Sequence, residues 1–326
     1  MTGHGQGDIK MKTRSGLFSC SRGFTLAELL TAMAIMAILI GLLVPTITII
    51  RKTAQKVRQK SQFHGIDIAL ESFRTDFGDY PNSSYDTGVD PGYCGAQKLA
   101  EAIVGWDGFG VHPKTEWRSD GLADWNGDSV YDDPDESVYH VTFDTPYESR
   151  EDNRKVRYGP YLELEAANAV KIGDLYPNPV GTPPSFLDPR RYVLADMFGK
   201  VTHLTTRKRT GMPILYYKAD VGSTEHRPTN VFVAGLPWPP QNIYNVTDNG
   251  PIYITAPPFG NRLHELAADQ ATFYDRTTNP NFPGRTIPPN LGLGRRPYRS
   301  ESFILHSAGR DGLYGTADDV YNFDTE

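Results

Sequence analysis

Residues 22–30 read Arg-Gly-Phe-Thr-Leu-Ala-Glu-Leu-Leu, and they open the segment that decides the fold. From Leu29 to Ile50 the chain runs for 22 residues without a charged side chain. A helix of that length reaches about 33 Å at 1.5 Å per residue, enough to cross the hydrocarbon core of a bilayer. The sequence therefore predicts one membrane-spanning helix near the N-terminus.

The flank ahead of this span is basic, with four Lys or Arg residues against one Asp between Met1 and Gly23. Such a flank stays in the cytoplasm, which places the rest of the chain outside it. Five basic residues also follow the span, so charge alone does not decide the orientation. The span is longer than the apolar core of a secretory signal peptide and does not end in a small-residue cleavage pattern, which favours a retained anchor.

Glu28 is the one charged residue between Phe24 and Ile50. On insertion scales a carboxylate costs about 2.5 kcal/mol or more at the centre of a spanning helix and less near the interface. A charge in this position is a functional hypothesis by default, and it requires a cationic partner.

Residues 22–30 resemble the processing site of type IV pilins and type II secretion pseudopilins. In that family a membrane peptidase cuts after the glycine, here Gly23, and methylates the new N-terminal residue, here Phe24. The resemblance implies that Glu28, the fifth mature residue, pairs with the N-terminal amine of a neighbouring subunit. It also places Pro45 where many pilins bend or melt this helix. A plain membrane anchor with a chance match is the alternative.

Apolar residues continue at three- and four-residue spacing beyond the span, which predicts a helix from about Phe24 to Phe77. The stretch from Ile68 to Pro81 resembles the end of the long helix in major pseudopilins. The predicted organisation is a cleaved leader (1–23), a membrane and filament-core helix (24–50), its outer half (51–81) and a globular domain (82–326). The apolar residues at helical spacing beyond the span form one stripe of the predicted helix: Val57, Phe63, Ile66, Ala69, Leu70 and Phe73.

The remainder predicts an α+β domain in which the long N-terminal hydrophobic helix packs on a small antiparallel β-sheet, the pilin fold that the resemblance implies. A short helix is expected at Ala96–Val104, and Val111–Ser137 is expected to be a loop. Residues 223–298 hold 12 of the 25 prolines, so we predict a loop-rich insertion over 219–300, with one short helix at Asn261–Tyr274. Predicted strands are Val138–Phe143, Val156–Leu164, Tyr192–Ala195, Ile214–Lys218, Asn230–Ala234, Ile252–Thr255 and Phe303–His306.

Three carboxylates, Asp311, Asp318 and Asp319, lie on a glycine-rich stretch near the C-terminus. Calcium takes six to eight oxygens from carboxylates, carbonyls and water. This stretch resembles the calcium site that closes the sheet of major pseudopilins, which implies these three residues as ligands. A solvated acidic turn is the alternative.

A second acidic stretch has oxygen-bearing residues at EF-hand spacing, with the Val130 carbonyl at position 7. Ser129 replaces the usual glycine at position 6 and an Asp replaces the usual Glu at position 12, so calcium binding is left open. The candidate ligands are Asp124, Asn126, Asp128, Asp132 and Asp135.

The composition and the motif content argue against several classes of function. The net charge of −6 argues against a nucleic-acid binder. The two cysteines are too few for a disulfide scaffold, and Cys94 would stay alone once the leader carrying Cys20 is removed. We find no catalytic motif, which predicts that the chain is not an enzyme.

The resemblance implies a structural pseudopilin, most like the major one, that assembles into the periplasmic pseudopilus of a type II secretion system. It would be a single-pass protein of the bacterial inner membrane with its C-terminal domain in the periplasm. Its partners would be copies of itself, other pseudopilins, the prepilin peptidase and the inner-membrane secretion platform, with calcium as the bound ion. A pilin of a true type IV pilus and a membrane-tethered binding module are the alternatives.

Overall fold

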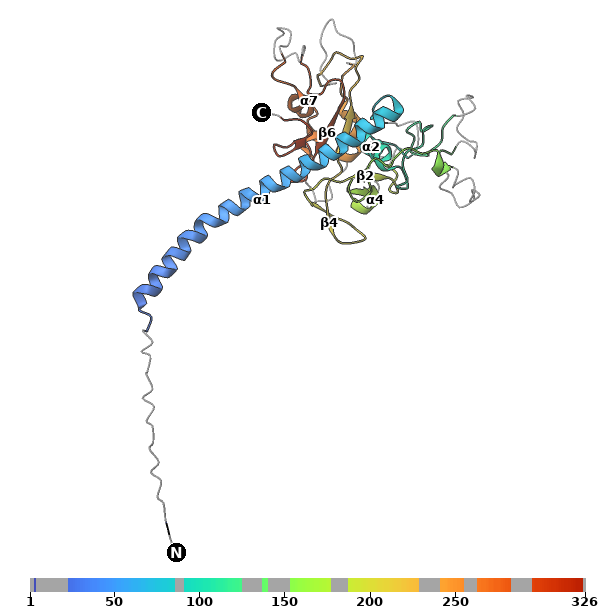
Figure 1. Cartoon of the computed structure of the whole chain (residues 1–326). Helices are drawn as coiled ribbons and strands as arrows, with labels where there is room; N and C mark the ends of the chain where they lie inside the picture. Colours follow the sequence, from blue (N-terminus) through green and yellow to red (C-terminus); the bar gives the residue numbers. More distant parts are fainter. Residues whose placement is uncertain are drawn as a thin grey trace. The chain divides into compact units, whose positions relative to one another are not determined.

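The computed structural model describes residues 3, 23–85, 91–124, 137–139, 153–176, 187–228, 241–254, 263–282 and 295–324 (Figure 1). Its contacts divide the chain into two compact units, Met1–Lys52 and Thr53–Glu326. Most of the predicted leader, the predicted strand Asn230–Ala234 and most of Val138–Phe143 lie outside the described residues.

The elements confirm the predicted α+β class. The helices are α1 (Leu26–Phe77), α2 (Gly95–Val104), α4 (Ile172–Leu175), the 3-10 helix η2 (Val246–Asn249), α5 (Gly250–Ile254), α6 (Glu265–Ala268) and α7 (Ala271–Thr277). The strands are β1 (Ala169–Lys171), β2 (Tyr192–Leu194), β3 (Val201–Thr202), β4 (Arg209–Thr210), β5 (Leu215–Lys218), β6 (Phe303–Ser307) and β7 (Val320–Tyr321).

Helix α1 starts within two residues of the predicted position, ends at Phe77 as predicted, and continues through Pro45. Among the described residues it is the helix long and apolar enough to cross a membrane. Its large apolar side chains up to Ile50 are exposed within the first unit. A helix that is apolar all round needs lipid or other helices around it.

Within the second unit α1 buries one face. Two buried glutamines begin that face, and both bond backbone groups just after β2. Gln62 Nε2 donates to Ala195 O at 2.9 Å, and Gln59 Oε1 accepts from Met197 N at 2.8 Å. Val57, which we placed in this stripe, is instead 61% exposed. The buried residues are Gln59, Gln62, Phe63, Ile66, Ala69, Leu70 and Phe73.

The central sheet has the order β5-β6-β7, with both pairs antiparallel. Side chains alternate between two apolar clusters because successive residues of a strand point to opposite faces. One face packs with α1 and α2 through Tyr216, Phe303, Leu305 and Val320. The other face carries Leu215, Tyr217, Ile304 and Tyr321.

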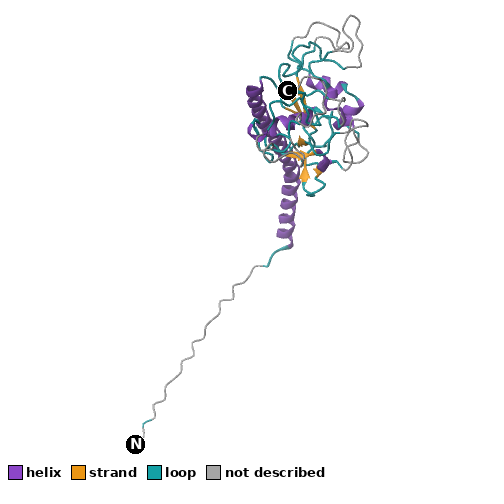
Figure 2. Cartoon of the chain, turned by 90° about the vertical axis from the view of Figure 1, so that its right-hand side faces the viewer, coloured by secondary structure: helices purple, strands orange, loops and turns teal. Residues whose placement is uncertain are grey.

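The segment between β5 and β6, predicted as a loop-rich insertion over 219–300, covers that second face and contributes side chains to the core. It holds η2 and α5 to α7, and Figure 2 shows helices on both sides of the strands. The predicted single helix at Asn261–Tyr274 is two short ones, α6 and α7. The side chains that complete the cluster include Tyr244, Ile252, Tyr253, Leu266, Phe273 and Tyr274.

Two predicted strands are wrong. Ile252–Thr255 is helical up to Ile254, because its apolar side chains turn into the core from α5. Val156–Leu164 forms no strand: it is mostly irregular backbone, with Tyr158 bridging to Val111 and a cis bond at Gly159-Pro160. Proline cannot donate to a strand ladder, which excludes it from the middle of a sheet.

Helix α2 is buried at every residue, and its N-terminus abuts the edge of β5. Asn249 links the two: its Oδ1 accepts from Ala96 N at 2.8 Å and its Nδ2 donates to Tyr216 O at 2.8 Å. A Cβ at Gly95 would lie 2.4 Å from Tyr216 O, so only glycine permits this approach.

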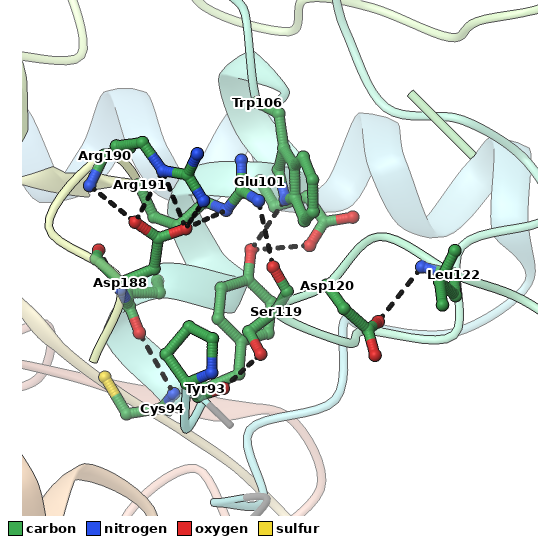
Figure 3. A network of polar contacts seen from close by, with 12 residues as sticks. Tyr93, Cys94, Glu101, Trp106, Ser119, Asp120, Leu122, Asp188, Arg190 and Arg191 are labelled. Atoms are coloured by element: carbon green, nitrogen blue, oxygen red, sulfur yellow. Dashed lines mark hydrogen bonds and ion pairs between the residues drawn. The ribbon is translucent and has the colours of Figure 1, made fainter. Parts of the chain in front are cut away.

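A buried carboxylate organises the segment around α2, which lies outside the pilin resemblance. Glu101 is 2% exposed and accepts three hydrogen bonds of 2.6 Å, from Tyr93 OH, Tyr139 OH and Thr115 Oγ1. Tyr93 OH in turn accepts from Trp106 Nε1 at 3.1 Å (Figure 3). Burial, followed by the charge of Glu101, raises the pKa of both tyrosines well above the usual value.

Candidate functional site

The start of α1 carries the predicted processing and assembly residues. Gly23, Phe24 and Thr25 precede the helix, and Phe24 is 79% exposed. Glu28 lies in the first turn, where its Oε2 accepts from Thr25 N at 3.0 Å and from Thr25 Oγ1 at 2.9 Å. Thr25 Oγ1 accepts in return from Glu28 N at 3.2 Å.

This reciprocal pair is a capping box, in which each residue satisfies a backbone donor of the other at the helix start. Thr25 is a site residue that we did not predict from the sequence. The spacing Thr-x-x-Glu before an apolar run was sufficient to find it. The box leaves the carboxylate beside the exposed Phe24, at the residue that would become the N-terminus after cleavage.

The three predicted calcium ligands lie in the turn between β6 and β7. Asp311 Oδ1 accepts from Leu313 N at 2.8 Å. Asp318 accepts from Asp311 N at 2.8 Å and from Thr316 Oγ1 at 2.6 Å. Burial raises the pKa of Asp311, whereas the hydrogen bonds to Asp318 outweigh its burial and lower the pKa of that carboxyl.

Asp319 is the buried member of the three. Its Oδ2 accepts from Gly315 N at 2.8 Å and lies 2.8 Å from His306 Nε2, in a pair with both side chains fully buried. Its Oδ1 is buried and has no hydrogen-bond partner in the described part of the chain. His306 stacks on Tyr321, and it is not predictable from the sequence as a partner of Asp319, because strand pairing brings it to this loop.

The fit to calcium is partial. Within the described residues no three His, Cys, Asp or Glu side chains converge as a group that could hold a metal ion. The unpartnered Asp319 oxygen is one ready ligand. Asp311 and Asp318 would have to contribute carboxylate oxygens to the ion while they keep their hydrogen bonds to the backbone of the loop. Of the second acidic stretch only Asp124 is described, so Asn126, Asp128, Asp132 and Asp135 lie outside the described residues.

Asp196 is a buried carboxyl that bonds to Ser307, where β6 ends and this loop begins. It is 1% exposed, and its Oδ2 accepts from Ser307 Oγ at 2.8 Å, while Ser307 Oγ accepts from Gly309 N at 3.2 Å. Its Oδ1 accepts from Phe198 N and Met212 N, both at 3.2 Å. Burial raises the pKa of Asp196 to about 7 despite these bonds.

We expect Asp196 to make the protein less stable as pH rises. A carboxyl with a folded pKa near 7 and an unfolded pKa near 3.9 makes its full contribution to the unfolding free energy below pH 3.9. That contribution is lost as pH rises from 3.9 to 7, because the unfolded chain releases the proton first. The loss is about 1.4 kcal/mol per pH unit across that window. Relative to Asp196→Asn, the wild-type chain should lose roughly 3 kcal/mol of unfolding free energy between pH 5 and pH 8.

Comparing the two proteins at each pH matters because other groups act in the opposite direction. Burial lowers the pKa of His226 to about 3 and of His264 to about 4. Those histidines favour the folded state as pH rises towards 6.5. Urea titrations of both proteins at several pH values give the difference, and parallel curves would show that Asp196 does not titrate in this range.

Comparison with known proteins bears on the N-terminus. The family described as the prokaryotic N-terminal methylation motif matches residues 18–44. No curated protein and no solved structure matches the chain. The matched residues include Gly23, Phe24, Thr25 and Glu28. At its N-terminus the chain is therefore type IV pilin-like, with the motif that prepilin peptidase processes and with a single apolar helix behind it.

Proposed function

We propose that the chain is a pseudopilin that assembles into the periplasmic pseudopilus of a type II secretion system and drives protein export. The observation that carries this proposal is the placement of Glu28 in the first turn of a helix that exposes apolar side chains up to Ile50. Such a helix is stable in a bilayer or among copies of itself. A carboxylate at its start needs a cation, and the amine of Phe24 in a neighbouring copy would supply one.

The same proposal fixes location and partners. The chain would sit in the bacterial inner membrane with one span and with residues 51–326 in the periplasm. Prepilin peptidase would cut after Gly23, and other pseudopilins and the secretion platform would contact the mature subunit. The chain would act by assembly and not as an enzyme.

A comparison of exported proteins tests this function. The parent strain, a deletion strain and the complemented deletion are grown together, and the secreted and periplasmic proteins are quantified. We expect the deletion to retain a set of exported proteins in the periplasm. Normal export with lost adhesion or motility would favour a pilus pilin. If export, adhesion and motility are all unchanged, a tethered binding module is favoured.

Calcium is the proposed ion of the loop between β6 and β7. If it binds there, Asp319→Ala should lower the melting temperature measured in calcium and abolish the difference between calcium and chelator. A ligand at 100 times its dissociation constant stabilises the folded state by about 2.7 kcal/mol. Equal melting temperatures of the unmodified chain with and without chelator would contradict the calcium site.

A further inference from the structure

The second unit contains a hollow of about 980 Å³. It lies between the stretches 79–84, 218–222 and 241–248 and the pair Glu301–Ser302, and we call it the acidic hollow. Among the described residues, four carboxylates line it together with one cation, Lys218, and the remaining lining is mostly amides and hydroxyls. The carboxylates belong to Asp79, Asp220, Asp248 and Glu301.

The outer part of this lining is accessible. The side chain of Glu301 is 78% exposed although it pairs with Arg296 at 2.7 Å, and that of Asp79 is 67% exposed although it pairs with Lys218. Asp220 is exposed, and its carboxylate accepts from Gly222 N and Ser223 Oγ. Beside it Val221 is 74% exposed, so an apolar side chain stands next to the negative charges.

Helix α1 presents the opposite charge. Its residues 51–60 include Arg51, Lys52, Lys56, Arg58 and Lys60, and the chain has no acidic residue from Leu29 to Ile66. Lys52, Lys56 and Lys60 repeat at four-residue spacing, where like charges repel and weaken a helix. Lys60 pairs with Asp324 at 2.9 Å, and the charge of Lys56 also acts on that carboxylate. Lys56 and Arg58 are exposed, with the 61% exposed Val57 between them in sequence.

We propose that the acidic hollow of one copy receives the basic stretch around Lys56 on α1 of a second copy in the filament. The contact pairs Lys56 and Arg58 with Asp220 and Glu301 and places Val57 near Val221. Complementary charges of this kind fix register and suppress wrong partners. The inference rests on the proposed function, because it needs assembled subunits.

A second copy fits better than lipid for a physical reason. A subunit that enters a filament leaves the bilayer, so headgroups no longer offset the repulsion among its cations. Each copy carries both surfaces, and a contact between two different surfaces builds an open helical filament when its rotation does not close a ring.

Charge reversal tests the contact in full-length chains. Asp220→Lys with Glu301→Lys, and separately Lys56→Glu with Arg58→Glu, should each lower the pelletable filament fraction roughly tenfold. All four changes in one chain should restore it to within about threefold, because opposite charges again face each other. The matched control is Glu163→Lys with Glu165→Lys, two exposed acidic residues outside the hollow, which should assemble normally.

Cross-linking gives a second measurement. Lys56→Cys with Asp220→Cys should yield a disulfide-linked ladder from filaments. Cys94 should not take part, because it is fully buried and burial raises the pKa of its thiol to about 11. Filaments with neither a ladder nor rescue by the fourfold change would overturn the contact and leave the proposed function standing.

Two other outcomes also count against the contact. If the Lys56→Glu, Arg58→Glu chain loses binding to anionic vesicles and the fourfold change does not rescue assembly, the cations serve lipid headgroups. If the unmodified chain forms no filaments, the proposed function fails together with this inference.

Discussion

Glu28→Ala should lower the filamentous fraction of the chain by about tenfold or more. The expected loss follows from coupling energies of about 1.5–7 kcal/mol measured for close charge pairs, since 1.4 kcal/mol corresponds to a factor of ten. In the complemented deletion strain, the same change should leave exported proteins in the periplasm. Pelleting after shearing and quantification of secreted proteins provide the two readouts.

The capping box requires a sharper set of variants, because Glu28→Ala also removes the hydrogen bonds from Thr25. Loss of a cap costs only about 0.5–2 kcal/mol of helix stability. Glu28→Gln keeps an oxygen acceptor for Thr25 but removes the charge, and Thr25→Ala keeps the charge but removes the hydroxyl. We expect Glu28→Gln to fail in assembly and Thr25→Ala to assemble.

The reverse result would show that Glu28 acts as a cap and that pairing with the amine of Phe24 is wrong. N-terminal mass analysis serves as the control, since each variant must still be cut after Gly23 for its assembly to be compared. An uncut variant that accumulates in the membrane would report on processing. For such a variant, assembly is measured from a chain that begins at Phe24.

The elements with strong local patterns were predictable. Helix α1 follows from an uncharged span and a stripe at helical spacing, and α2 follows in the same way. Strands β5 and β6 combine β-branched or aromatic residues with nearby turn residues, and both appear where they were predicted. Short strands such as β3, β4 and β7, two residues each, carry too little pattern to be read.

The segment between β5 and β6 shows what composition alone does not predict. A high proline content indicates loops, but it does not say what the intervening aromatic residues cover. Tyr253 and Tyr274 are buried against the sheet, which therefore has both faces covered. The run at 252–255 was ambiguous in principle, because a short apolar run fits a buried strand and a buried helix equally well.

The candidate site divides in the same way. Gly23, Phe24 and Glu28 are adjacent in sequence, so the motif reveals them, and Thr25 was readable from the same nine residues. The pairing of His306 with Asp319 and the support from Asp196 depend on residues that are distant in sequence. No local pattern encodes such contacts, and only the strand register brings them together.

Glu101→Ala should lower the unfolding free energy by about 4 kcal/mol, since each buried hydroxyl that loses its hydrogen-bond acceptor costs about 1–3 kcal/mol. The carboxylate accepts three hydrogen bonds, and its loss leaves the buried hydroxyls of Tyr93 and Tyr139 without this acceptor. Each hydrogen bond to a charged group contributes about 1.5–3 kcal/mol. For a unit of this size the melting temperature should fall by roughly 8–15 °C.

Glu101→Gln separates the hydrogen bonds from the charge. It keeps an oxygen for Tyr139 and Thr115 and offers Tyr93 a donor instead of an acceptor, so we expect a loss of about 1–2 kcal/mol. Glu163→Ala, at an exposed position, should change the stability by less than about 0.5 kcal/mol. Equal stabilities of all three variants would show that the buried carboxylate does not organise this segment.

Hydrogen exchange locates the effect. Residues 91–124 contain Tyr93, α2 and Thr115, and this stretch should lose protection in Glu101→Ala before the sheet does, because sub-global opening needs less free energy than complete unfolding. Strands β5 and β6 should keep their protection at low denaturant, since α1 and the segment between β5 and β6 also cover the sheet and α2 is only one part of its clusters. Uniform loss across the second unit would instead mean that α2 and the sheet unfold as one, through the Asn249 link that joins Ala96 to Tyr216.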